Sequence, residues 1–144
     1  MPGRTTYTRA ELDHARSAIA ERVAAYDRLV LAVQRAADPR AALSLKAFEP
    51  LYFNDLVLEM DGYFVHRKPV VAGQDGNPLN EVQLLADSLQ HNSGVLRGSD
   101  AVDLVADESV LGLAIGDRIR VRAAEFERLA AAFFAEITTR FQAR

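Results

Sequence analysis

Two side chains near the middle of the chain have the types and the spacing for acid–base chemistry. Asp87 and His91 lie four residues apart in a segment whose apolar spacing predicts a helix over 78–92, so both fall on one helix face and can touch. A carboxylate beside an imidazole stabilises the charged ring and fixes its orientation. The pair is therefore a candidate for catalysis. The alternative is a structural histidine at a helix end, held by Asp87 and by the helix dipole.

The segment around this pair reads Ala86-Asp87-Ser88-Leu89-Gln90-His91-Asn92-Ser93-Gly94, and it resembles the signature of the HEPN domains. The resemblance implies an all-α module of the kind found in RNA-cleaving toxins and their relatives. In that family an arginine precedes an Asn, Asp or His, and the catalytic histidine follows, commonly with a glycine close behind. Asp87, His91 and Gly94 fit this pattern. The positions at which the family allows the arginine hold apolar residues instead: Leu84, Leu85 and Ala86.

The resemblance also implies a reaction and an assembly. An active member would cleave RNA through attack of a ribose 2′-OH on the adjacent phosphate, with Asp87 and His91 in the site and the arginine neutralising the phosphorane. HEPN proteins commonly pair with two motif helices facing one another, and the apolar neighbours of the helix tip suit such a homodimer: Leu89, Val95 and Leu96. Because Ala86 carries no charge, the sequence predicts little or no cleavage.

Four arginines elsewhere in the chain are candidates for contacts with phosphate or RNA. Arg118, Arg120 and Arg122 alternate along a predicted strand, so their side chains would share one face, and Arg97 could join them. No aromatic residues are interleaved for stacking on bases. Alternating charges also protect a strand edge from pairing, so the phosphate site and the protected edge both stand as interpretations.

The remaining polar groups have ordinary explanations in the sequence. The histidines stand singly, without a second ligand at helical spacing, which favours surface positions over a metal site; they are His14, His66 and His91. One polar stripe on an otherwise apolar helix favours a solvent-facing side over acid–base work; its members are Asp55, Glu59 and His66. Asn80 and Glu81 follow a turn and a helix cap, and the sequence gives them no role. No metal or cofactor is predicted.

The spacing of apolar residues predicts the helices that position these groups. A capping box at Thr8 and Glu11 opens a helix over 8–37. A short helix or turn over 40–48 precedes a second long helix that begins at Pro50 and runs to about residue 67. Helices over 78–92 and 123–141 follow. The inward residues of the four long helices should meet in one cluster: Tyr26, Met60, Phe64, Leu85, Phe133 and Ile137.

Between the last two helices the spacing of apolar residues changes from the helical period to the two-residue period of a β-strand. Apolar residues over 110–121 flank Gly116-Asp117, which predicts a β-hairpin with a two-residue turn. Residues 102–105 are a candidate third strand. The expected fold is mainly α: four long helices in an up-down-type bundle with a short β-hairpin inserted before the last helix.

Composition limits the class of protein. The chain has 144 residues, a net charge of −3 and no cysteine, which predicts a single domain over 1–144 without disulfides, in keeping with the cytoplasm. No apolar run approaches the length of a membrane span. The sequence therefore predicts a non-catalytic or weakly catalytic HEPN-like module that forms a homodimer and binds RNA or a toxin or antitoxin partner. The alternatives are an active metal-independent RNase and a purely structural interaction module.

Overall fold

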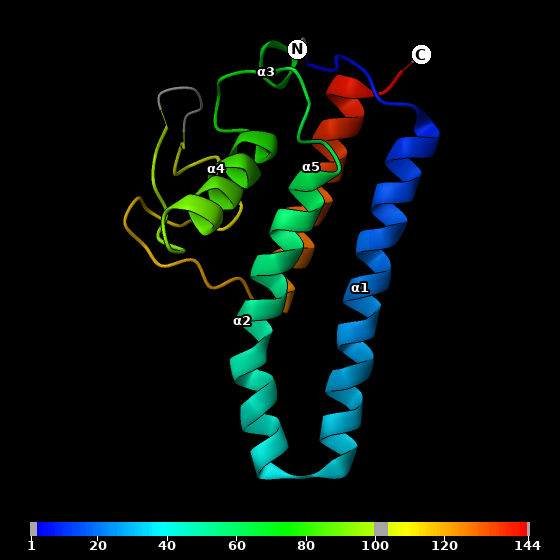
Figure 1. The fold of residues 1–144 in the computed structure, drawn as a ribbon, viewed down its shortest axis with the longest axis vertical. Helices are drawn as coiled ribbons and strands as arrows, with labels where there is room; N and C mark the ends of the chain where they lie inside the picture. Colours follow the sequence, from blue (N-terminus) through cyan, green and yellow to red (C-terminus); the bar gives the residue numbers. More distant parts are fainter. Residues whose placement is uncertain (1–2, 100–103, 144) are drawn as a thin grey trace.

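The computed structural model describes residues 3–99 and 104–143. Its helices are α1 (Arg9–Ala36), α2 (Pro39–Gly62), α3 (Pro69–Ala72), α4 (Pro78–His91) and α5 (Ala123–Phe141). The first two form a long antiparallel hairpin, and α5 lies alongside it (Figure 1). None of the helices in the described part of the chain is long and apolar enough to cross a membrane.

Local signals set both ends of α1 as predicted. Thr8 and Glu11 form the capping box, in which each side chain accepts a hydrogen bond from the other residue's backbone N–H. At the far end Ala37 adopts a left-handed conformation with φ of 50°. Asp38 then caps α2 by accepting the N–H of Arg40. Only these two residues separate α1 from α2, so the helices must pack side by side.

The prediction of two separate helices over 40–48 and from Pro50 is wrong. The structure has one continuous helix, α2, with Pro50 in its interior. A proline there removes one backbone hydrogen bond and costs about 3 kcal/mol. Packing along α1 offsets that cost, because Tyr52 donates a hydrogen bond to the Arg22 carbonyl at 2.9 Å and stacks on Tyr26. A tertiary contact thus overrides a local break signal.

The core lies where α2, α4 and α5 meet the first half of α1. All six residues predicted to meet belong to this buried cluster, which confirms that part of the prediction. Its centre is aromatic: Phe53 contacts Phe126, and Phe64 contacts Phe133. The α5 helix runs antiparallel to α1, because its last turn meets the start of the chain through a hydrogen bond from Tyr7 N–H to the Phe141 carbonyl.

The up-down four-helix arrangement is not what the structure has. Only α1, α2 and α5 run together, while α4 lies across them and packs mainly on α2 and α5 (Figure 1). The five-residue turn between α3 and α4 and the loop after α4 allow this oblique placement. As a result the α4 tip, defined here as residues 87–94, stands at the side of the molecule rather than at an end of a bundle.

The predicted β-hairpin is also wrong, since no strand forms over 110–121 in the described chain. A tight turn does exist, with Gly116 at φ of 96° and the Asp117 carboxylate accepting the Ala114 N–H. The segment after it pairs elsewhere: Val95 and Arg118 form an isolated antiparallel bridge. The segment before it is held by Glu81 instead. Of the candidate strand over 102–105, residues 102 and 103 lie outside the described residues, and 104–105 are not a strand.

Candidate functional site

The α4 tip presents both predicted catalytic side chains to solvent. Asp87 and His91 are exposed on the outer side of α4, as their spacing requires. Within residues 3–99 and 104–143 no hydrogen bond or ion pair joins them. His91 is in the last turn of the helix, where the dipole favours a positive charge. The structure therefore places the two residues on one surface but does not couple them.

The positions at which an arginine would complete the HEPN-like motif all face the core. Leu84 and Leu85 are each 1% exposed, and Ala86 is 2% exposed. A guanidinium at any of them would be buried among apolar side chains, away from Asp87 and from solvent. The missing arginine is therefore a consequence of how α4 packs. No single substitution at these sites would supply the charge.

The only arginine described beside Asp87 comes from a part of the chain that sequence reasoning did not consider. A small pocket of about 150 Å³ is lined by Asp87 and Gln83 from α4, and by Asp61 and Arg67 from the end of α2 and the turn after it. The Arg67 side chain is 4% exposed and forms an ion pair with Asp61 at 2.9 Å. Asp61 and Arg67 are six residues apart across a helix end, and no helical spacing predicts that contact.

Hydrogen bonds inside the protein occupy the guanidinium of Arg67. It donates to the Phe64 and Leu79 carbonyls at 3.0 and 3.1 Å, in addition to Asp61. Burial raises the pKa of the Asp61 carboxyl, and the charge of Asp87 adds to that rise, while Arg67 opposes it. The pocket thus carries two carboxylates against one arginine that is already engaged. Such a balance disfavours a phosphate group there.

A second group of charged residues beside the α4 tip is basic, in contrast to the acidic pocket around Asp61 and Asp87. Residues 94–96 run antiparallel to 117–119, with hydrogen bonds of 2.8 Å from Leu96 N–H to Asp117 O and from Ile119 N–H to Gly94 O. Directly opposed residues of an antiparallel pair share a face. The side chains of Val95 and Arg118 therefore point the same way.

The basic residues of this paired segment lie on its outer side. Leu96, Ile119 and Val121 are buried on the inner side, whereas the alternating arginines are exposed: Arg97, Arg118 and Arg120. We call these three the arginine face. Arg118 also donates a hydrogen bond to the Ser93 carbonyl at 3.3 Å, which joins the face to the α4 tip. None of the three forms an ion pair within the described residues.

Arg122, the fourth predicted contact, belongs to a different environment. Its guanidinium forms an ion pair with Glu49 at 3.2 Å, and the same Glu49 carboxylate accepts the Ala123 N–H at 2.8 Å. Arg122 thus helps to attach the start of α5 to α2. Three of the four arginines that the sequence suggested are exposed in or next to the paired segment, whereas Arg122 is held by Glu49.

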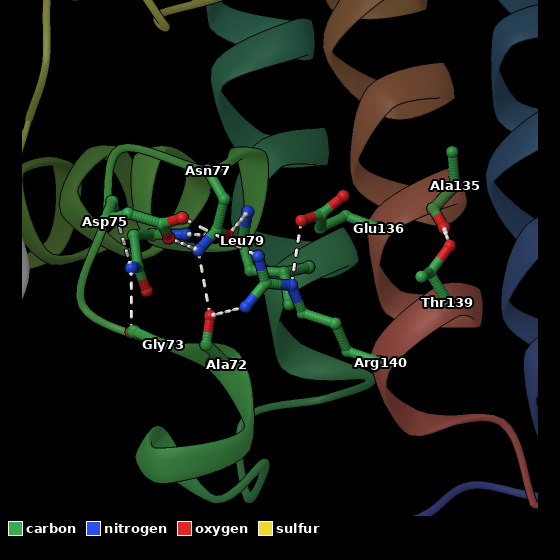
Figure 2. Close-up of polar contacts among 10 residues, drawn as sticks. Ala72, Gly73, Asp75, Asn77, Leu79, Ala135, Glu136, Thr139 and Arg140 are labelled. Atoms are coloured by element: carbon green, nitrogen blue, oxygen red, sulfur yellow. Dashed lines mark hydrogen bonds and ion pairs between the residues drawn. The ribbon is translucent and has the colours of Figure 1, made fainter.

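The polar residues before and within the first turn of α4 are structural. The Asn77 side chain accepts the Leu79 N–H and donates to the Ala72 carbonyl, and Arg140 of α5 donates to the same carbonyl (Figure 2). Asn80 donates to the Gly73 and Asp75 carbonyls. These contacts fix the 73–77 turn against α5 and give Asn80 the role that the sequence left open.

Glu81 holds the long loop after α4 in place. Its buried carboxylate accepts hydrogen bonds from the Ser109 hydroxyl, the Val110 N–H and the Leu111 N–H, at 2.8, 2.7 and 3.0 Å. A charged acceptor satisfies these loop groups as a strand partner would. This is why residues 110–111 do not form the predicted hairpin.

The other predicted polar groups do not assemble into a site. Glu59 forms an ion pair with Arg22 of α1 at 2.8 Å, while Asp55 and His66 are exposed. His14 lies edge-on to the Tyr63 ring. No group of three potential metal ligands occurs among the described residues.

Comparisons with known proteins do not assign the chain to a family. No family model, no curated protein and no solved structure matches the chain. The resemblance to HEPN domains stays a prediction from the sequence, and the function has to be inferred from the surfaces described above.

Proposed function

We propose that the chain is a non-catalytic, HEPN-like helical module that binds the phosphate backbone of RNA at the arginine face, next to the α4 tip. The observation that carries the proposal is the arginine face. Arg97, Arg118 and Arg120 are exposed on one side of a paired segment and have no acidic partner within the described residues. Each guanidinium can bind a phosphate through two parallel hydrogen bonds as well as through its charge.

The α4 tip supports binding more than cleavage. The positions for the motif arginine are buried, and Arg67 is committed to Asp61 and to backbone carbonyls. Neither the motif positions nor Arg67 can therefore supply a guanidinium to a phosphorane beside Asp87 and His91, and the loss of such a group typically costs a factor of 100 or more, on the order of 3 kcal/mol.

The expected binding is sequence-independent and weak at physiological salt. Phosphate contacts position a protein but do not read bases, and the arginine face includes no aromatic side chain for stacking. With about three phosphates contacted, the logarithm of the affinity for single-stranded RNA should fall with the logarithm of salt at a slope of about −2. This slope is a signature that a purely structural module would lack.

Fluorescence anisotropy with a labelled single-stranded RNA tests the proposal. Arg118→Glu together with Arg120→Glu should weaken binding at low salt by tenfold or more and flatten the salt slope. Arg28→Glu is the matched control, because Arg28 is exposed on α1 and far from the α4 tip; it should leave most of the affinity. Absence of salt-dependent binding, or an equal loss in the control, would overturn the RNA-binding proposal. Cleavage of RNA by the wild type that disappears in His91→Ala would instead establish the active RNase.

A further inference from the structure

The far end of the α1–α2 hairpin carries apolar side chains that no other described element covers. The start of α5 is level with Glu49, whose carboxylate accepts the Ala123 N–H, so residues 28–48 extend beyond α5 (Figure 1). Leu29, Phe48 and Leu51 are 43%, 39% and 66% exposed. Large apolar residues gathered in one place are characteristic of an interaction surface.

These side chains lie on one face of the hairpin. A shallow groove of about 420 Å³ runs between the two helices, and Leu29, Val33, Ala41 and Phe48 are among the residues that line it. On α1 the same side continues with small exposed residues, which together with Leu29 are spaced by four, three and four and allow close approach of another helix: Ala25, Ala32 and Ala36. We call this surface the hairpin face.

Charges at the two ends of one row along α2 flank the hairpin face in a self-complementary pattern. Arg40, Ser44, Phe48, Leu51 and Asp55 follow one another at intervals of four, four, three and four, so they form one row along the helix. The midpoint of the row falls beside Phe48, with the arginine at one end and the aspartate at the other. Neither charged side chain forms an ion pair within the described residues.

We propose that the hairpin face binds a second copy of the chain around a twofold axis that passes beside Phe48. The two α2 helices then run antiparallel, and the two Phe48 rings pack together. Ser44 of each copy lies opposite Leu51 of the other, and Arg40 lies opposite Asp55. A twofold interface requires a surface that is complementary to itself, and the sequence of this row meets that requirement in both shape and charge.

The available area agrees with a reversible dimer. From Arg40 to Asp55 the helix rises about 22 Å, and two neighbouring helices are about 20 Å wide. Each copy therefore contributes about 450 Å², or roughly 900 Å² in total, which is below the area of stable complexes and in the range of weak, transient ones. The α4 tip offers less, because Leu96, one of the apolar residues predicted to face a partner, is buried in the chain's own core.

Sedimentation equilibrium over a concentration series measures the predicted association. The wild type should show a monomer–dimer equilibrium. Arg40→Glu or Asp55→Arg should raise the dissociation constant about tenfold, since each change places two like-charge pairs in the dimer. The double variant should recover the wild-type constant. Leu43→Asp is the control: Leu43 is 70% exposed on the same helix but lies about 140° around it from Phe48, so dimerisation should persist.

Introduced cysteines test the antiparallel arrangement, because the chain has no cysteine of its own. Ser44→Cys mixed with Leu51→Cys should form a disulfide-linked dimer on mild oxidation, while either variant alone should form at least tenfold less. A strict monomer at every concentration, failure of the charge-swapped double variant to recover, or equal crosslinking of each cysteine with itself would overturn the proposal. None of these outcomes depends on whether the α4 tip binds RNA.

Discussion

The α4 side of the molecule and the far end of the α1–α2 hairpin differ in how their backbone and side chains are held. Within α4 nearly every apolar side chain is buried, and polar groups such as Glu81 and Asn77 hold the neighbouring turns in place. Over residues 28–48 the hairpin has only its own second helix as a partner in the described chain, and leucines and Phe48 remain exposed. The first region is fixed by internal contacts, and the second has exposed apolar surface that another molecule can cover.

This difference assigns RNA binding and dimerisation to two separate surfaces, whereas the sequence predicted both at one place. The resemblance to HEPN domains put both the RNA-facing surface and the dimer contact at the α4 tip. We propose phosphate contacts beside that tip and self-association at the far end of the α1–α2 hairpin. Each of the two proposals can therefore be tested by changes that leave the other surface intact.

The largest effect should come from Ala86→Arg. Ala86 is buried on the inner side of α4. The new guanidinium would therefore be desolvated without a partner and would overpack the core, at a cost of about 5 kcal/mol. Chemical denaturation should show an unfolded or barely stable protein. Ala47→Arg, on the exposed side of the hairpin, is the control and should change the free energy of unfolding by less than about 0.5 kcal/mol. A stable Ala86→Arg protein that gains RNA cleavage would show that α4 can present an arginine after all.

Phe133→Ala should be the next most damaging change, with a loss of about 4 kcal/mol in the free energy of unfolding. Phe133 is 0% exposed and contacts Phe64 and Phe134. Phe48→Ala deletes the same atoms from the hairpin face and should cost less than about 1 kcal/mol when the protein is monomeric. Similar losses in urea denaturation for the two variants would mean that the two regions do not differ as described.

Glu81→Gln tests how the loop after α4 is held. The glutamine amide cannot accept all three hydrogen bonds that the carboxylate receives, so one buried donor loses its partner at a cost of about 2 kcal/mol. Hydrogen exchange should accelerate at the amides of residues 110–111. Glu127→Gln, exposed on α5, should change neither quantity. Unchanged exchange in Glu81→Gln would remove the explanation for the missing β-hairpin.

The smallest effect concerns the start of α1. A hydrogen bond from Arg4 and the backbone N–H of Thr8 lower the pKa of Glu11 to about 2. Because the folded-state pKa is lower than the ordinary value of 4.5, the stabilisation is present above that value and is lost as the pH falls towards 2. In Glu11→Gln the unfolding temperature should therefore decline less between pH 5 and pH 2. Glu21→Gln should decline as the wild type does, and an identical decline in Glu11→Gln would contradict the assignment.

Local signals in the sequence were enough to predict α1, α4 and α5. Each of these signals fixes a helix end only a few residues away in the sequence: the Thr8–Glu11 box, the Asn77 cap and the glycine after α4. Pro50 and the Gly116-Asp117 turn are equally local, yet they misled, because contacts from far along the chain decided their surroundings. Packing on α1 keeps α2 continuous, and Glu81 takes the hydrogen bonds that a hairpin would have used.

The candidate site was predictable only in part, for a similar reason. Helical spacing places Asp87 and His91 on the outer side of α4, and alternation places Arg118 and Arg120 outside. Their common surface with Arg97 depends on the pairing of 94–96 with 117–119, which no local pattern announces. The buried ion pair of Asp61 and Arg67 was missed because it bridges the end of one helix and the following turn.

We propose that the arginine face beside the α4 tip binds RNA phosphates and that the protein does not cleave the RNA. A single-stranded RNA labelled with a fluorophore and a quencher, incubated with the protein in the absence of metal, tests it most directly, because anisotropy reports binding and dequenching reports cleavage in one sample. The account predicts salt-sensitive binding that Arg118→Glu with Arg120→Glu weakens by tenfold or more, and a fluorescence intensity that stays constant. Dequenching that vanishes in His91→Ala, or an absence of binding at low salt, would contradict it.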